Sequence, residues 1–152
     1  MGSYRGRSTV SLALGVKESG NGIKVYAIDP HEQYVGILGG KFGPSDRRAF
    51  FKNILMADVV EHVRLVNLKS NVASKGWMEE IAFLFLDGDH SYEGVSQDIN
   101  YWKPHLAPNA LVAFDDSLSP SIGPYKIIRE LCVGLCERIR VVGKITLVRI
   151  KS

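Results

Sequence analysis

The 152-residue sequence predicts an α/β fold in which an open, mostly parallel sheet carries helices on both faces. Apolar runs of strand length alternate with segments of helical period. The runs are continuously hydrophobic, which is typical of strands that are covered on both faces. The end of the chain departs from this order, because two strand-like segments joined by a tight turn predict an antiparallel pair there.

Each element follows from a local pattern. The predicted parallel strands are residues 23–29, 62–68, 81–87 and 110–116. The predicted helices are residues 8–18, 45–57, 93–102 and 122–137. Ser8 is the expected cap of the first helix, and Ser45 with Asp46 provides the start signal of the second. The closing strands RIRVV and ITLVRI meet at Gly143-Lys144, which predicts a hairpin turn.

Composition indicates one compact domain with a hydrophobic core, because 45% of the residues are hydrophobic. Lys and Arg total 19 against 16 Asp and Glu, and they are spread along the chain, which argues against nucleic acid as a partner. No apolar run approaches the roughly 20 residues of a membrane span, and the start lacks the apolar core of a signal peptide. We therefore expect a cytoplasmic protein with no membrane partner. Cys132 and Cys136 are expected to share one face of the last helix as small core residues.

Polar side chains follow every predicted parallel strand. In an open α/β sheet, ligands bind outside the carboxyl ends of the strands. The residues at these exits are Asp29, Ser70, Asp87 to His90, and Asp115-Asp116. We therefore expect the functional residues at this edge of the sheet.

The segment GSYRGRST at residues 2–9 joins two glycines to the start of a helix. Glycines at 2 and 6 allow a ligand to approach the backbone, and the helix start offers free N–H groups to an anion. The segment matches neither the dinucleotide motif nor the P-loop, so an ordinary turn is the alternative. Asp29 is in position to accept hydrogen bonds from ribose hydroxyls, with a helix cap or a solvated turn as its alternative.

The adjacent acids Asp115 and Asp116 would repel each other without a cation or a proton. Together with Asp87 they offer three carboxylates, the ligands that Mg²⁺ prefers. The alternative is a turn followed by a helix cap. His90 is three residues after Asp87 and is suited to accept a proton near neutral pH, although many histidines are only polar surface groups.

Several segments together resemble the class I S-adenosylmethionine-dependent methyltransferases. They are GSYRGRST, YAIDPHE, the stretch FLFLDGDHSYEGVSQDINYWKPHLAPNALVAFDD and the closing strand pair. The branch that they resemble is the small O-methyltransferases, which include metal-dependent macrolide-sugar and catechol-type enzymes. The resemblance covers nearly the whole chain and implies a Rossmann-like sheet.

The resemblance also implies roles for individual residues. Asp29 is expected to bind the cofactor ribose, and the region of Ser70 to lie at the edge of the adenine. His90 is expected to be the general base. The full set implied for the cofactor is Gly2, Ser3, Tyr4, Gly6, Ser8, Asp29, Ser70 and Asp87. The set implied for Mg²⁺ is Asp87, Asp115 and Asp116.

The expected function is methyl transfer from S-adenosylmethionine to a hydroxyl of a small molecule, assisted by Mg²⁺. A metal-dependent hydrolase and a non-catalytic methyltransferase-like module are the alternatives, and a homo-oligomer stays open. The family's first strand, before GSYRGRST, has no counterpart in the sequence. We therefore expect a single domain at residues 1–152, truncated at its N-terminus, with a gap, a shifted strand pairing or a partner's strand in the sheet.

Overall fold

The computed structural model describes residues 1–151, which form two compact units. Gly2–Ala73 is called the N-terminal unit here. Met1 together with the residues from Ser74 onward is called the C-terminal unit. Within the described part of the chain, no helix is both long enough and apolar enough to cross a bilayer.

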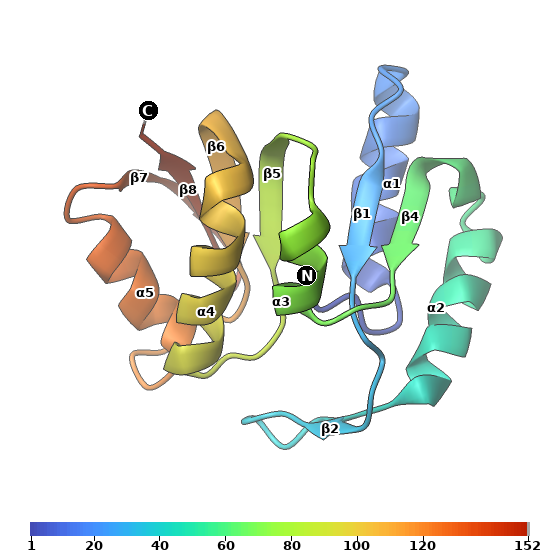
Figure 1. The fold of residues 1–152 in the computed structure, drawn as a ribbon, viewed down its shortest axis with the longest axis horizontal. Helices are drawn as coiled ribbons and strands as arrows, with labels where there is room; N and C mark the ends of the chain where they lie inside the picture. The colour runs from blue at the N-terminus through green and yellow to red at the C-terminus, as the bar shows by residue number, and fades with distance from the viewer. Residues whose placement is uncertain (152) are drawn as a thin grey trace. The chain divides into compact units, whose positions relative to one another are not determined.

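The N-terminal unit is built on a parallel strand pair with two long helices (Figure 1). The strands are β1 (Val25–Ile28) and β4 (Val63–Val66), and the helices are α1 (Arg7–Ser19) and α2 (Pro44–Met56). Smaller elements are the hairpin β2 (Tyr34–Val35) and β3 (Lys41–Phe42), a 3-10 turn (Val60–His62) and α3 (Ser70–Ala73). The sequence patterns predicted the two strands and two long helices, but neither the hairpin nor α3.

The core of the N-terminal unit forms where α1 and α2 pack against the strand pair. Phe50 and Ile54 are one turn apart on α2, so they share a face, and both are buried. They belong to a cluster with Ala13 of α1, Ala27 of β1 and Val63 of β4. Burying the larger side chains of this cluster, Phe50, Ile54 and Val63, stabilises the fold by about 1.5 to 3 kcal/mol each.

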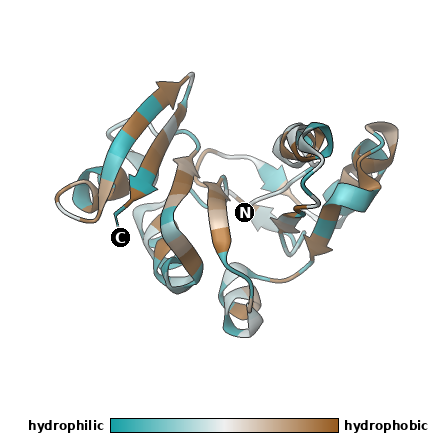
Figure 2. Ribbon diagram, turned by 90° about the horizontal axis from the view of Figure 1, so that it is seen from above, coloured by the Kyte–Doolittle hydropathy of each residue, from teal (hydrophilic) through white to brown (hydrophobic). Residues whose placement is uncertain are grey.

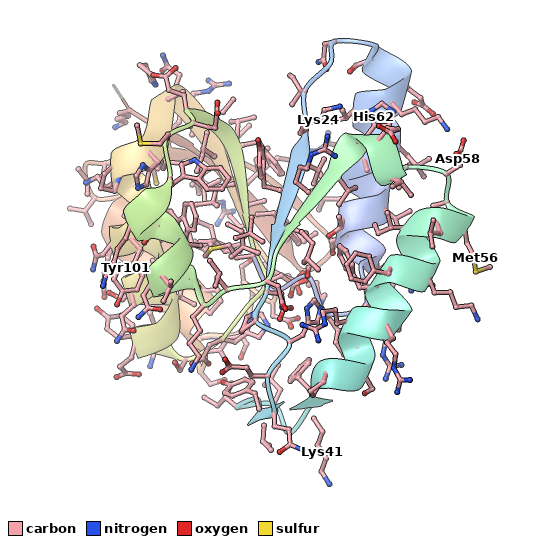
Figure 3. All side chains as sticks on the ribbon, turned by 45° about the vertical axis from the view of Figure 1, so that its right-hand side comes forward. Lys24, Lys41, Met56, Asp58, His62 and Tyr101 are labelled. Carbon is pink, nitrogen blue, oxygen red and sulfur yellow. The ribbon has the colours of Figure 1, made fainter. Side chains whose placement is uncertain are left out.

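The two ends of this strand pair differ in chemistry. At the amino ends, Lys24 and His62 lie close to the strand starts (Figure 3), and Lys24 Nζ donates to the backbone oxygen of Glu61 at 2.7 Å. At the carboxyl ends lie Asp29, after β1, and Asn67, after β4. The carboxyl ends therefore carry the acid that the sequence predicted as a ligand group.

The C-terminal unit contains a four-stranded mixed sheet in the order β5-β6-β8-β7. Its strands are β5 (Ile81–Leu86), β6 (Leu106–Phe114), β7 (Cys136–Val142) and β8 (Ile145–Ile150). Its helices are α4 (Tyr92–Trp102), α5 (Gly123–Leu131) and 3-10 turns at Ser74–Gly76 and Lys103–His105. The β5·β6 pair is parallel, whereas the β6·β8 and β8·β7 pairs are antiparallel.

Helices α4 and α5 lie on the same side of this sheet (Figure 1). Hydrophobic and hydrophilic segments alternate along the helices (Figure 2), as expected for helices with one face on a sheet. The buried residues of α4 are Val95, Ile99 and Trp102. The predicted α/β fold with a closing antiparallel strand pair is confirmed.

Two predicted helix ends are wrong. The first helix begins at Arg7, and Gly6 is its N-cap. Ser8 is therefore a residue of the first helical turn and not the cap. The last helix ends at Leu131, and Cys136 opens β7. The two cysteines therefore share no helix face, although their Sγ atoms lie 3.1 Å apart.

Among the described residues the strands form three separate ladders, β1·β4, β2·β3 and β5-β6-β8-β7. An interrupted sheet is one of the departures that the sequence predicts. In the C-terminal unit, Met1 N donates to Phe85 O at 2.5 Å and Asp87 N donates to Met1 O at 3.0 Å. In the N-terminal unit, Gly2 N donates to Ile28 O at 3.1 Å.

Candidate active site

The glycine-rich turn of the N-terminal unit has a left-handed backbone at several residues. Gly2, Tyr4 and Gly6 have φ values of 75°, 45° and 86°. A Cβ atom at Gly6 would lie 3.0 Å from Cδ2 of Phe50, so glycine is required there for both conformation and space. Gly6 also caps α1 without a side-chain hydrogen bond, which leaves N–H groups of the first turn available to a ligand.

Asp29 joins this turn to the end of β1. Its Oδ2 accepts from Tyr4 N at 2.8 Å, and its Oδ1 accepts from His31 N at 2.8 Å. The side chain remains 16% exposed. Since a carboxylate oxygen can accept two hydrogen bonds, each oxygen keeps capacity for a ligand hydroxyl.

His31 is a member of this site that the sequence reasoning missed. It is buried, and its Nε2 lies 2.8 Å from the backbone oxygen of Tyr4. Asn67 Nδ2 donates to Asp29 O at 2.8 Å and lies 3.4 Å from His31 Nδ1. The segment DPHE contained a signal, since a histidine two residues after a strand-exit acid can pack beneath the turn.

An ion pair between the exposed Arg5 side chain and the buried Asp46 carboxylate holds the turn against α2. Arg5 Nε donates to Asp46 Oδ1 at 2.8 Å, and Asp46 Oδ2 accepts from Gly43 N at 2.9 Å. Asn53 of α2 donates to the backbone oxygen of Arg5 at 2.8 Å. Asp46 therefore lies at the start of α2, as predicted, and also positions the glycine-rich turn.

The hydroxyl of Ser3 is the unexplained polar group of this turn. Its Oγ is buried and has no hydrogen-bond partner among the described residues. Leaving a buried hydroxyl unpaired costs about 1 to 3 kcal/mol, so such groups are usually satisfied by water or a ligand. Of the other residues implied for the cofactor, Ser8 lies in the first turn of α1, and Ser70 is the first residue of α3.

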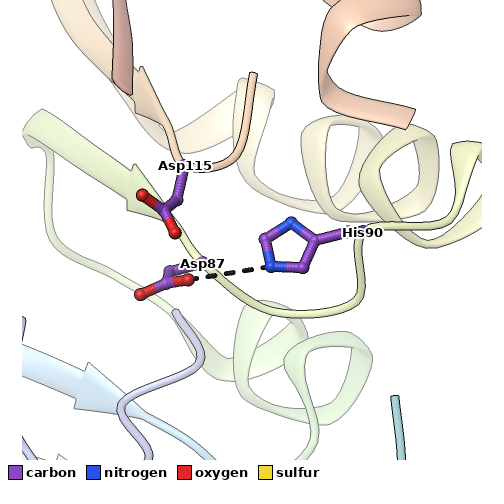
Figure 4. Close-up of side chains that lie close together, drawn as sticks. All are labelled: Asp87, His90 and Asp115. Carbon is purple, nitrogen blue, oxygen red and sulfur yellow. Dashed lines mark ion pairs between the residues drawn. The ribbon is translucent and has the colours of Figure 1, made fainter. Parts of the chain in front are cut away.

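The second group of site residues lies at the carboxyl ends of β5 and β6. Leu86 and Phe114 are partners in the parallel register, so the next residues, Asp87 and Asp115, leave the sheet side by side. His90 follows in the loop after β5 (Figure 4). Asp87, His90 and Asp115 offer ligand atoms that all lie within 4.8 Å of one another.

The environment of Asp87 disfavours its charge. Burial raises the pKa of Asp87 to about 7, and the negative charge and hydrogen bond of Asp115 add to the effect, while Lys144 opposes it. His90 Nε2 lies 3.8 Å from Asp87 Oδ1 and 3.7 Å from Asp116 Oδ2. Two carboxylates therefore face the imidazole, and a bound cation would be stabilised here.

The loop between Asp87 and α4 is stabilised by Asp89. Its side chain accepts from Ser91 N at 2.9 Å and from Ser91 Oγ at 3.0 Å, and Ser91 Oγ in turn caps α4 by accepting from Gly94 N at 3.0 Å. Gly123 N donates to His90 O at 2.8 Å. Asp89 therefore orders the turn that presents His90.

Lys144 is the second residue that the sequence reasoning missed. Its Nζ donates to Asp115 Oδ2 at 2.7 Å and lies 3.0 Å from Asp116 Oδ1. Asp116 has a φ of 47°, so the chain turns sharply between the two acids. The sequence did contain a signal for this contact, because the turn of the predicted β7–β8 hairpin lies at the carboxyl end of β6.

Known proteins share both the sequence pattern and the fold. A sequence model of the methyltransferase domain family matches residues 1–117. The chain belongs to this methyltransferase family. The resemblance that the sequence shows is thereby confirmed, and the enzyme class with it.

Solved O-methyltransferase structures have the same fold. NovP superposes with a TM-score of 0.76 at 15% identity, over 98% of this chain and 69% of NovP. TomG of Streptomyces achromogenes, which is involved in tomaymycin synthesis and was solved with S-adenosylmethionine, gives 0.68 at 15% identity, over 99% and 71%. CalS11, a TDP-rhamnose 3'-O-methyltransferase of calicheamicin biosynthesis, gives 0.66 at 20% identity, over 97% and 69%. At these identities the likeness establishes the fold of this methyltransferase domain.

Proposed function

We propose that this methyltransferase domain transfers the methyl group of S-adenosylmethionine to a hydroxyl of a small molecule, assisted by Mg²⁺. The convergence of Asp87, His90 and Asp115 at the carboxyl ends of two neighbouring strands carries the proposal. TomG, which binds S-adenosylmethionine, and CalS11, which methylates a sugar hydroxyl, have this fold and support both the cofactor and the acceptor class.

In this proposal the N-terminal unit binds the cofactor. The unpaired Ser3 hydroxyl and the free N–H groups at the start of α1 suit its amino-acid portion, which carries a carboxylate. Asp29 accepts hydrogen bonds from the ribose, because its carboxylate retains acceptor capacity beside Tyr4 and His31. Gly2, Gly6, Ser8 and Ser70 complete the proposed set in this unit.

The acids of the C-terminal unit suit a divalent cation. Asp87 and Asp115 repel each other when both are ionised, and the raised pKa of Asp87 reflects this repulsion together with burial. A hard cation offsets such repulsion and takes carboxylate ligands, and we assign Asp87, Asp115 and Asp116 to it. Bound Mg²⁺ supplies electrostatic stabilisation of negative charge on the acceptor oxygen.

His90 is the proposed general base. Its Nε2 takes the proton of the acceptor hydroxyl while the oxygen forms a bond to the methyl carbon. The carbon–sulfur bond breaks, and its electron pair stays on sulfur, which yields S-adenosylhomocysteine. The carboxylates of Asp87 and Asp116, 3.8 and 3.7 Å from Nε2, stabilise the imidazolium that forms. Alignment of the two reactants contributes about 7 to 11 kcal/mol in well-oriented systems.

The experiment that tests the proposal is a transfer assay with S-adenosylmethionine labelled in its methyl group and a panel of small molecules with and without hydroxyls. We expect label to appear only in hydroxyl compounds, to disappear after chelation, and to return with Mg²⁺. Transfer that survives exhaustive chelation would remove the metal from the proposal. A folded sample that binds no S-adenosylmethionine at millimolar concentration would refute the proposal as a whole.

A further inference from the structure

The turn between β7 and β8 places Lys144 at the candidate cation site. Thr146 of β8 pairs with Phe114, the last residue of β6, in antiparallel register. The hairpin turn at Gly143-Lys144 therefore lies at the same end of β6 from which Asp115 emerges. Gly143 has a φ of 56°, which allows the tight turn.

The backbone of Lys144 is anchored to the segment that follows the acids. Ser117 N donates to the backbone oxygen of Lys144 at 2.9 Å. The hydroxyl of Ser117 lies 3.0 Å from the same oxygen and 2.7 Å from Thr146 Oγ1. Ser117 is buried, so these bonds are sheltered from water and fix the point from which the lysine side chain extends.

The ammonium group is in position to compensate two carboxylates at once. It lies 2.7 Å from Asp115 Oδ2 and 3.0 Å from Asp116 Oδ1. Hydrogen bonding to Asp115 is the main cause that raises the pKa of Lys144, so the group stays charged at physiological pH. The Asp115 side chain is only 6% exposed, whereas that of Lys144 is 61% exposed. The lysine can therefore leave toward solvent, but the acid cannot.

Asp115 also belongs to the group of converging ligand atoms with Asp87 and His90. A divalent cation at this group would share the Asp115 carboxylate with the ammonium, and the two positive charges would repel each other. We propose that Lys144 is a resident cation that competes with the divalent cation for Asp115 and thereby weakens metal binding. This inference rests on the proposed function, because it assumes that the group binds a metal.

The competition has two consequences. Without metal, Lys144 offsets the charge of Asp115 and Asp116 and keeps the exit of β6 ordered. With metal, the lysine side chain moves to solvent. The site then binds the divalent cation only when the concentration of the free cation is high enough to displace the lysine. The occupancy of the site therefore depends on that concentration.

The test is a calorimetric titration of Mn²⁺, a spectroscopically visible substitute for Mg²⁺, into metal-free wild type and Lys144→Met. We expect at least tenfold tighter binding by the variant, since the competing charge is gone. Lys144→Arg, which keeps the charge, should bind like wild type. Lys126→Met removes the same charge from the exposed face of α5 and should change the affinity less than twofold.

Thermal melting adds a readout that a purely structural lysine would not produce. Metal-free Lys144→Met should melt below wild type, and Mn²⁺ should raise its melting temperature by more than it raises that of wild type. Lys144→Gln serves the same purpose if the methionine variant does not fold. Unchanged or weaker Mn²⁺ binding in the folded variants would overturn the competition.

A parallel titration with S-adenosylmethionine separates the two levels of the proposal. If wild type binds Mn²⁺ and the variant binds no tighter, only the role of Lys144 fails. If no chain binds Mn²⁺ while all bind S-adenosylmethionine, the metal and Lys144 competition both fail and methyl transfer stands. If none binds S-adenosylmethionine, the proposed function fails independently of the metal result.

Discussion

The two units hold their acids in different ways. In the N-terminal unit, Asp29 is bound by backbone N–H groups of Tyr4 and His31, which are neutral and belong to the fold itself. In the C-terminal unit, Asp87 lies beside another acid, and Lys144 provides the compensating charge to Asp115 through a flexible side chain. Backbone donors cannot leave without unfolding the turn, whereas an ammonium can be exchanged for another cation.

This difference suits Asp29 and the pair Asp87 and Asp115 to different ligands. The Asp29 site has a shape that is set by the backbone and suits a ligand with fixed hydroxyl positions. The Asp87 site has a charge that is only partly compensated and suits a cation or a developing positive charge. Substitutions at the Asp29 site should alter the affinity for the methyl donor. Substitutions at the Asp87 site should alter turnover, metal affinity and the pH dependence of stability.

The largest effect is expected for His90→Ala. Removing the proposed general base should lower turnover by about 10² to 10⁴-fold, because the acceptor hydroxyl would keep its proton in the transition state. Mn²⁺ affinity should change less than threefold, which a titration of the same sample measures. A loss of metal affinity of tenfold or more would make His90 a ligand and not the base.

Gly6→Ala should have the next largest effect, on the N-terminal unit. A left-handed alanine costs about 1 to 3 kcal/mol, and its Cβ would lie 3.0 Å from Phe50, so we expect a total loss of about 2 to 4 kcal/mol in unfolding free energy. Urea denaturation measures the loss. Gly15→Ala is the matched control, since its Cβ meets nothing within 4 Å inside α1 and should stabilise by about 0.5 to 1 kcal/mol. A similar response at both glycines would contradict the special role of the turn.

Asp29→Ala should weaken S-adenosylmethionine binding by about 1 to 3 kcal/mol, which is the contribution of hydrogen bonds to a charged acceptor. The measurement is calorimetric titration of a sample whose folding is verified by circular dichroism. Asp58→Ala removes an exposed acid that pairs with Lys17 in the same unit and should leave the affinity unchanged. Equal S-adenosylmethionine affinities of the two variants would mean that Asp29 stabilises the turn and does not contact the cofactor.

The smallest effect is expected for Asp87→Asn, and it should depend on pH. The folded protein keeps the proton of Asp87 up to a pKa of about 7, whereas the unfolded chain releases it near pH 4. The folded state therefore binds more protons between these values, and wild-type stability falls as pH rises through this range. With chelator present, the variant should be as stable as wild type at pH 4 and should gain stability over wild type as pH rises from 4 to 8. An advantage at pH 4 would contradict the assigned cause.

The sequence predicted most of the fold because its strands are apolar runs with clear ends. It predicted the last helix too long, because residues after Leu131 continue the helical pattern while a turn around Gly134 leads into β7. The hairpin of β2 and β3 was missed because strands of two residues carry no periodicity. Such elements depend on tertiary packing that local patterns do not encode.

The candidate site was predicted where the residues follow strands directly. Asp87 and Asp115 come together because β5 and β6 are parallel neighbours. Lys144 and His31 were missed because both reach their sites through turns, whose geometry depends on positive φ values at Gly143 and at His31 itself. A lysine in a hairpin turn is usually a solvated group, so its sequence position alone does not indicate an ion pair.

The measurement that most directly tests the division of work is a paired titration of S-adenosylmethionine and Mn²⁺ into Asp29→Ala and Asp115→Asn. We predict that the Asp29 variant loses affinity for S-adenosylmethionine and keeps its Mn²⁺ affinity. The Asp115 variant should lose Mn²⁺ affinity and keep S-adenosylmethionine affinity within about threefold, since the buried amide retains the shape of the acid. Parallel loss of both ligands in both variants, with the fold intact, would contradict two separate sites and mark these acids as structural.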